Sequence, residues 1–163
     1  MDLSMPKSSL ALIVLTIWVS SNAISHAAEP WPNTSCERLA KNIMTATGIP
    51  VSISIEKIVS DYQGDIIPDG YACMVKGRAS GINQSWSKGY ARTRAISNGW
   101  TDIVEVEADS AMSSTWGFRK GNQELIMHLD SDPPEACADG PAHYCKAPRK
   151  LWIWNIKAMA YQR

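Results

Sequence analysis

The pattern of apolar and polar residues first predicts a helix. Apolar side chains recur at the spacing of one helix face, at Cys36, Leu39, Ala40 and Ile43. The segment 34–37 fits a capping box, in which a hydroxyl caps the first turn and a glutamate follows three residues later. Gly48 is a natural residue just past a helix end, and Pro50 prevents the helix from continuing. We therefore expect a helix over residues 35–47, with Cys36 on its apolar face.

Beyond Pro50 the apolar residues alternate with polar ones, which is the period of a β-strand with one buried face. The alternating apolar residues are Val51, Ile53 and Ile55 in the first such segment and Tyr71, Cys73 and Val75 in the second. Further strands are expected at residues 86–96 and 151–160. The whole pattern predicts an α+β fold, with one N-terminal helix packed on a mostly antiparallel sheet of about six or seven strands.

Two dipeptides predict hairpins between such segments. Asn98-Gly99 favours a type I′ turn, because both central residues of that turn need a positive φ. This hairpin would bring opposite charges together across the strand pair. Its expected neighbours are Arg92 with Glu105, Lys88 with Asp109, and Tyr90 with Glu107. A second hairpin at Gly121-Asn122 would pair Arg119 with Glu124, Phe118 with Leu125, and Trp116 with Met127.

Four cysteines fit two disulfides if the chain is exported to an oxidising compartment. Four cysteines allow three pairings. We favour Cys36–Cys73, which would join the helix to the sheet, and Cys137–Cys145, because both lie in one loop rich in proline and glycine. A zinc site is the alternative. It lacks support because the chain has no C-x-x-C motif and few histidines.

The first 27 residues have the parts of a secretory signal peptide. Lys7 gives a weakly basic start, residues 10–19 form a short apolar run, and Ser25 and Ala27 are the small residues of a cleavage site. A membrane-spanning helix needs about 20 apolar residues, so this run is too short for a stable anchor. We expect a signal peptide over 1–27 and a single mature domain over 28–163, secreted or periplasmic, with no stable membrane anchor after cleavage.

Composition narrows the classes of function without naming an activity. The chain has 163 residues, with 16 basic and 16 acidic side chains and zero formal net charge, which argues against an obligate polyanion binder. It lacks G-x-S-x-G, H-E-x-x-H, the P-loop and G-x-G-x-x-G, the signatures of several enzyme classes. The sequence thus predicts a protein that works by binding rather than catalysis, with no cofactor and no metal site.

Segregated charge leaves one catalytic alternative open. Residues 70–101 carry basic side chains and no acid, whereas residues 102–109 carry acids and no base. The simpler interpretation is mutual neutralisation across strands. The alternative is a small secreted hydrolase of the ribonuclease type, in which a glutamate, a histidine and an arginine converge on a sheet. The corresponding residues in this chain would be Glu105, Glu107, His128, Arg92, Arg94 and Tyr90.

The C-terminal segment supplies the predicted binding surface. Trp152 and Trp154 share one side of the expected last strand and follow Arg149 and Lys150. The two tryptophans either belong to the core or form an exposed platform, which would bind a ligand together with Lys150 and Arg149. A protein or glycan partner fits an exported chain better than a nucleic acid, so no nucleic-acid partner is predicted.

Overall fold

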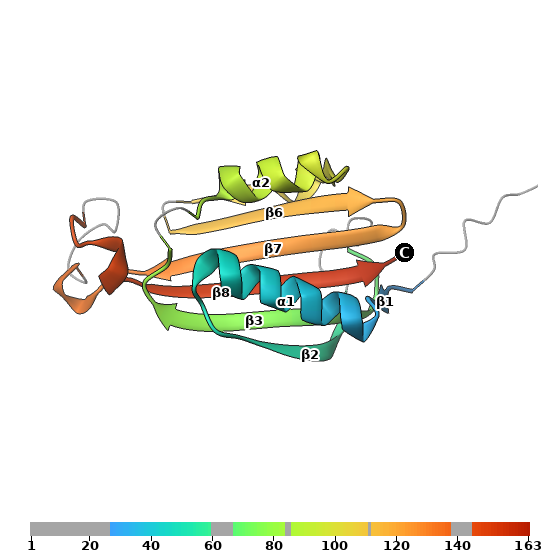
Figure 1. Ribbon diagram of the computed structural model, residues 1–163, viewed down its shortest axis with the longest axis horizontal. Helices are drawn as coiled ribbons and strands as arrows, with labels where there is room; N and C mark the ends of the chain where they lie inside the picture. The colour runs from blue at the N-terminus through green and yellow to red at the C-terminus, as the bar shows by residue number, and fades with distance from the viewer. Residues whose placement is uncertain (1–26, 60–66, 84–85, 111, 138–144) are drawn as a thin grey trace, which may run out of the picture.

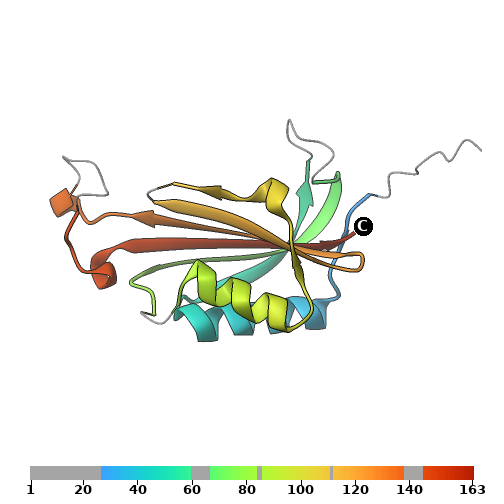
Figure 2. The ribbon, with the colours of Figure 1, turned by 90° about the horizontal axis from the view of Figure 1, so that it is seen from above.

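The computed structural model describes residues 27–59, 67–83, 86–110, 112–137 and 145–163. The predicted signal peptide, apart from Ala27, lies outside the described residues. Within them, two α-helices pack on one face of an antiparallel sheet of eight strands (Figures 1 and 2). The predicted α+β fold is therefore confirmed, although the helix count and the strand count are both higher than expected. None of the described helices is long and apolar enough to cross a membrane.

In chain order the elements are β1 (Glu29–Pro30), α1 (Asn33–Thr47), β2 (Val51–Ile58), β3 (Gly70–Ser80), α2 (Lys88–Ser97), β4 (Thr101–Asp102), the 3₁₀ helix η1 (Val104–Val106), β5 (Ala108–Asp109), β6 (Ser113–Lys120), β7 (Gln123–Asp132), the 3₁₀ helices η2 (Glu135–Cys137) and η4 (Arg149–Leu151), and β8 (Ile153–Gln162).

The last strand in the chain occupies the centre of the sheet. The strand order is β2-β3-β8-β7-β6-β4, with β1 also pairing with β8 and β5 with β6. β8 pairs with β7 from Ile153 opposite Asp132 to Gln162 opposite Gln123. On its other side it pairs with β3, up to Ser80 opposite Ile153. The predicted strand 151–160 is thus shifted by two residues. It forms the central strand that joins the two halves of the sheet.

α1 begins earlier than expected, and the predicted capping box is wrong. The residue before the helix is Pro32, and no side chain caps the first turn. Instead the carbonyl of Pro32 accepts hydrogen bonds from the backbone N–H groups of Ser35 and Cys36, at 2.8 and 3.1 Å. The C-terminal end is as predicted, because Gly48 adopts a left-handed φ of 77°.

The main core lies between the helices and one face of the sheet, here called the inner face. α1 contributes the buried side chains of Cys36, Ala40, Ile43 and Thr47. The sheet contributes inward residues from β3, β6, β7 and β8, among them Val75, Trp116, Phe118, Met127, Leu129 and Ile156. Both predicted disulfides are confirmed: Cys36–Cys73 joins α1 to β3, and Cys137–Cys145 closes the loop before β8.

The segment predicted as a third strand is the helix α2, and the hairpin predicted at Asn98-Gly99 is wrong. The hydroxyl oxygen of Ser87 caps this helix by accepting the backbone N–H of Tyr90 at 3.1 Å. Only Gly99 has a positive φ, 77°, whereas Asn98 has a φ of −95°. A type I′ turn needs both, so the dipeptide ends a helix instead of joining two strands.

The other hairpin and the first strands follow the sequence pattern more closely. Arg119 pairs with Glu124, and the rest of the β6–β7 register is as predicted around Gly121. β2 and β3 form the predicted strands. Ile53 and Ile55 remain 42% and 47% exposed, because β2 is an edge strand that the helices do not cover completely.

A second cluster on the opposite, outer face of the sheet holds the C-terminal end of the chain in place. Glu124 is buried and binds Arg119 at 2.7 Å and Arg163 at 2.8 Å. The hydroxyl of Tyr161 donates a hydrogen bond of 2.6 Å to the same carboxylate. Buried carboxylates are stable only with such partners, so Glu124 fixes the end of β8 against the β6–β7 hairpin.

We predict that loss of Cys36–Cys73 destabilises the protein more than loss of Cys137–Cys145. The two rings span 37 and 8 residues. The loss of loop entropy in the unfolded chain then stabilises the folded state by about 4 kcal/mol for Cys36–Cys73 and about 2.5 kcal/mol for Cys137–Cys145. Urea unfolding of the Cys36→Ala/Cys73→Ala and Cys137→Ala/Cys145→Ala double variants measures both values. Equal losses would show that the larger ring adds nothing.

We also predict that the phenol of Tyr161 ionises only at an abnormally high pH. Burial raises the pKa of its phenol above the ordinary value, and the hydrogen bond to Glu124 raises that pKa further. In the unfolded chain the phenol of Tyr161 ionises at about pH 10. Its contribution to the free energy of unfolding is therefore fully present below that pH. The contribution is lost as the pH rises from there toward the folded-state pKa. Tyrosinate absorbance should show one of the five tyrosines ionising only on alkaline unfolding. Tyr161→Phe should remove that step.

Candidate ligand-binding groove

α2 stands on the sheet without burying any of its ten residues. The residues turned toward α1 include Ala91 and Ala95, which are four positions apart and therefore share one helix face. Packed helices usually place larger apolar side chains at such positions. The small side chains leave a groove of about 870 Å³ between the two helices, above the sheet. This volume lies within the range of ligand-binding pockets in proteins.

The groove has an apolar floor and helical walls. Phe118, Leu125 and Met127 of β6 and β7 form the floor. The wall on the α1 side is lined by Ser35, Arg38, Leu39, Asn42, Ile43, Thr45 and Ala46. The wall on the α2 side is lined by Tyr90, Ala91, Arg94, Ala95 and Asn98. The arrangement combines an apolar surface with a few polar groups at its margin, which is typical of binding sites.

Aromatic side chains lie at both ends of the groove. α1 and α2 run in opposite directions, so Trp31, before α1, meets Trp100, after α2, with ring centroids 5.7 Å apart. The indole N–H of Trp31 donates to the carbonyl of Tyr161 at 3.0 Å, which fixes this end against β8. Trp86, before α2, packs against Trp116 of the sheet at 5.9 Å. The three tryptophans that line the groove, Trp31, Trp86 and Trp100, are therefore held in place by packing.

Charge in the groove has one sign. Among its lining residues the charged groups are Arg38 and Arg94, and no acid is present. Arg94 also donates a hydrogen bond of 3.0 Å to the hydroxyl of Tyr90, one helical turn away. The groove therefore favours a ligand with an apolar body and an anionic group.

Ion pairs hold α2 from the side that faces away from the groove. Arg92 binds Asp102 of β4 at 2.7 Å and Glu107 at 3.4 Å. Lys88 binds Asp109 of β5 at 2.9 Å. The hydrogen bond from Lys88 lowers the pKa of Asp109 below its ordinary value. The predicted neighbours Lys88 and Asp109 thus meet, but from a helix to a strand, whereas Arg92 contacts Asp102 and Glu107 instead of Glu105.

The predicted ribonuclease-like set is divided between the two faces of the sheet, because Arg92 meets Glu107 at 3.4 Å but His128 lies on the opposite face. Thr115 pairs with Ala108 on one side and with His128 on the other, so these three side chains share the outer face. Glu107, the neighbour of Ala108, turns to the inner side and contacts α2. His128 and Glu107 therefore lie on opposite faces of the sheet. Glu105 is exposed in η1, and Tyr90 and Arg94 line the groove.

The predicted platform at the start of β8 is largely turned inward. Trp154 is 6% exposed, and its indole N–H donates to the carbonyl of Arg149 at 3.2 Å. Trp152 is partly buried and donates to the carbonyl of Ala147 at 3.1 Å. The guanidinium of Arg149 lies 4.8 Å from the ring of Trp154. Lys150 is exposed beside them. The two rings lie 6.4 Å apart and support the η4 turn, so little of this pair faces solvent.

Sequence reasoning missed the groove because it assigned α2 to a strand. The alternation of small and polar residues in this segment satisfies both the period of two and the period of 3.6. Two features favour the helix: Ser87 at a capping position, and the spacing of four between Lys88 and Arg92, which places both charges on one helix face.

We predict that Arg92→Met loosens α2 without unfolding the domain. The variant loses the contacts to Asp102 and Glu107, so backbone amides of α2 should exchange with deuterium faster. Global stability should fall by no more than about 1 kcal/mol, the usual range for exposed ion pairs. The control is Arg78→Met, which also removes one arginine but not from α2. Arg78 has only a long contact of 3.9 Å to Asp132. Unchanged exchange in α2 would contradict the role of the ion pairs.

The chain matches no family model, no curated protein and no solved structure. Its function therefore has to be inferred from the geometry and chemistry of its own residues.

Proposed function

We propose that this protein is an exported binding module that holds a segment of a protein partner in the groove between α1 and α2. The observation that carries the proposal is the incompletely buried inner face of α2, where Ala91 and Ala95 leave an open channel above an apolar floor. The helix is held by ion pairs on its far side, so the channel is kept open without a ligand. Such preorganisation lowers the entropic cost of binding.

Polar groups in the walls favour a peptide over a purely apolar ligand. Asn42 and Gln123 line the groove, and their side chains form no hydrogen bond within the described residues. Amide side chains can both donate to and accept from a peptide backbone. Arg38 and Arg94 supply positive charge for an acidic side chain or a terminal carboxylate. The ligand class that fits best is an extended apolar segment with one or two acidic groups.

Export forms part of the same proposal. Residues 1–27 would act as a signal peptide that is removed after Ala27, and the domain would work in the periplasm or outside the cell. Two disulfides support this, because such bonds persist in oxidising compartments. Ala28 is buried and its N–H donates to the carbonyl of Asp69 at 2.8 Å. A new amino terminus at Ala28 could still donate this hydrogen bond.

Filling the groove should abolish binding. Ala95→Trp places a large ring in the channel, whereas Ile96→Trp adds the same ring to the exposed side of the same helix. Binding is measured with heptapeptides that combine apolar residues with either aspartate or lysine, and is detected by the fluorescence of the tryptophans around the groove. We expect the acidic peptides to bind the native chain and the Ile96→Trp variant, with at least tenfold weaker binding to Ala95→Trp.

Three results would decide against the proposal. These are equal affinity of both variants, equal affinity of the acidic and basic peptides, or no binding of any peptide at millimolar concentration. Binding of neutral oligosaccharides that Ala95→Trp abolishes would assign the groove to a glycan partner instead.

A further inference from the structure

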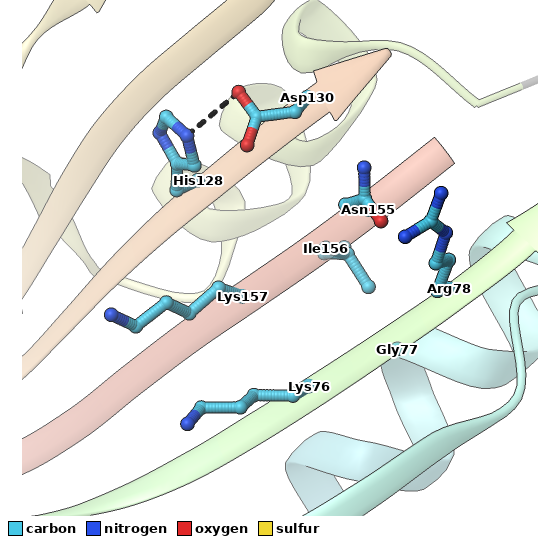
Figure 3. Close-up of a pocket in the computed structure, with 8 residues that line it drawn as sticks. All are labelled: Lys76, Gly77, Arg78, His128, Asp130, Asn155, Ile156 and Lys157. Carbon is cyan, nitrogen blue, oxygen red and sulfur yellow. Dashed lines mark ion pairs between the residues drawn. The ribbon is translucent and has the colours of Figure 1, made fainter. Parts of the chain in front are cut away.

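A shallow cavity of about 460 Å³ lies on the outer face of the sheet, opposite the groove. Its side chains come from three neighbouring strands, β3, β8 and β7 (Figure 3). The lining residues are Lys76, Gly77, Arg78, His128, Asp130, Asn155, Ile156 and Lys157. Three of these side chains are cationic and one is a carboxylate, so the cavity carries positive charge in a protein whose total charge is zero.

The register of the sheet places like charges directly opposite each other in this cavity. Lys76 of β3 pairs with Lys157 of β8, and Lys157 pairs with His128 of β7. Figure 3 shows the two lysines extending in the same direction from adjacent strands. Like charges in directly opposed positions destabilise a sheet. Positions that break such local rules of stability are often functional, and Glu56 offsets only the Lys76 side of this pair by a direct contact.

The acids around the cavity lie against other cations, and none of them forms a direct ion pair with Lys157 within the described residues. Glu56 binds Lys76 at 2.6 Å, and this hydrogen bond lowers the pKa of Glu56, with a smaller lowering from the charge of Lys157. Asp132 lies 3.9 Å from Arg78 and accepts a hydrogen bond from Asn155 at 3.3 Å. Lys157 is exposed and forms neither a hydrogen bond nor an ion pair within the described residues. Its ammonium group is therefore available to a ligand.

His128 is held in a fixed orientation beside this lysine. Its Nδ1 lies 2.6 Å from the hydroxyl of Thr115, and its Nε2 lies 2.8 Å from a carboxylate oxygen of Asp130. Both ring nitrogens have a partner, so the imidazole is fixed at the rim of the cavity. Asp130 is the one acid in the cavity lining, and its charge is directed at the imidazole.

We propose that this cavity binds a tetrahedral oxyanion, namely a phosphate or sulfate group carried by a small ligand. Lys157 is its principal contact, whereas Lys76 and Arg78 on the neighbouring strand already face Glu56 and Asp132 and contribute less. Ammonium groups bind such anions as point charges and do not need a fixed fork geometry. The volume exceeds that of one phosphate, which leaves room for part of the molecule that carries it. This site is separate from the groove, because the sheet lies between them.

The experiment is a titration of the full chain, with both disulfides formed, followed by amide NMR shifts. The probes are inorganic phosphate, glucose 6-phosphate, glucose 6-sulfate and acetate. We expect the doubly charged phosphates to bind more tightly than acetate, with shifts centred on Lys76, His128 and Lys157. Tighter binding of glucose 6-phosphate than of inorganic phosphate would show that the ligand is an organic ester, and the reverse would identify free phosphate. Preference for glucose 6-sulfate would identify a sulfated sugar.

Two lysine variants separate a specific site from general charge attraction. Lys157→Met should weaken phosphate binding at least tenfold. Lys57→Met changes the net charge equally, but Lys57 is exposed on the other face of β2, so binding should be unchanged. Equal loss in both variants, or no shifts at millimolar phosphate, would overturn the proposal.

A third variant tests whether removing negative charge from the cavity strengthens phosphate binding. Asp130→Asn removes the one carboxylate that lines the cavity, so it should strengthen phosphate binding several-fold. Weaker binding in this variant would contradict a site that works by positive charge.

Discussion

The shape of the binding surface depends on the ion pairs that attach α2 along one side. Arg92 and Lys88 reach outward to acids of the β4–β5 edge, while the opposite side of the helix carries alanines. Ala91 and Ala95 are only partly buried against the core, and these small side chains bury little apolar area. Ion pairs at defined positions fix the helix along its other side. The channel is therefore a consequence of where the charges lie.

The parts of the fold that the sequence predicts are those in which one period dominates. α1 has a clear helical stripe, and the β6–β7 hairpin is fixed by a turn with glycine in its first central position. α2 was not predictable from alternation, because its small residues fit either period and Asn98-Gly99 occurs both in hairpins and at helix ends. Its true position depends on acids 10 to 21 residues away, with which its cations pair.

The candidate sites also divide into features that the local sequence predicts and features that depend on contacts between distant residues. Both disulfides followed from the residues and their spacing, since few partners were available. The groove did not, because it requires two helices, and only one was expected. Trp152 and Trp154 were recognised as a pair, but their direction depends on the η4 turn, whose carbonyls accept their indole N–H groups. The outer cavity needed the register of three strands that are distant in sequence, which composition does not reveal.

The central place of β8 has a consequence for how the molecule forms. β8 follows every other strand in the chain, yet β3 and β7 each pair with it along most of its length. Until it is present, the two halves of the sheet have no common partner, and their inner faces cannot be joined into one core. Contacts between such distant segments form late. The chain therefore cannot complete its sheet or its core before the last strand, Ile153–Gln162, is available to pair with both halves.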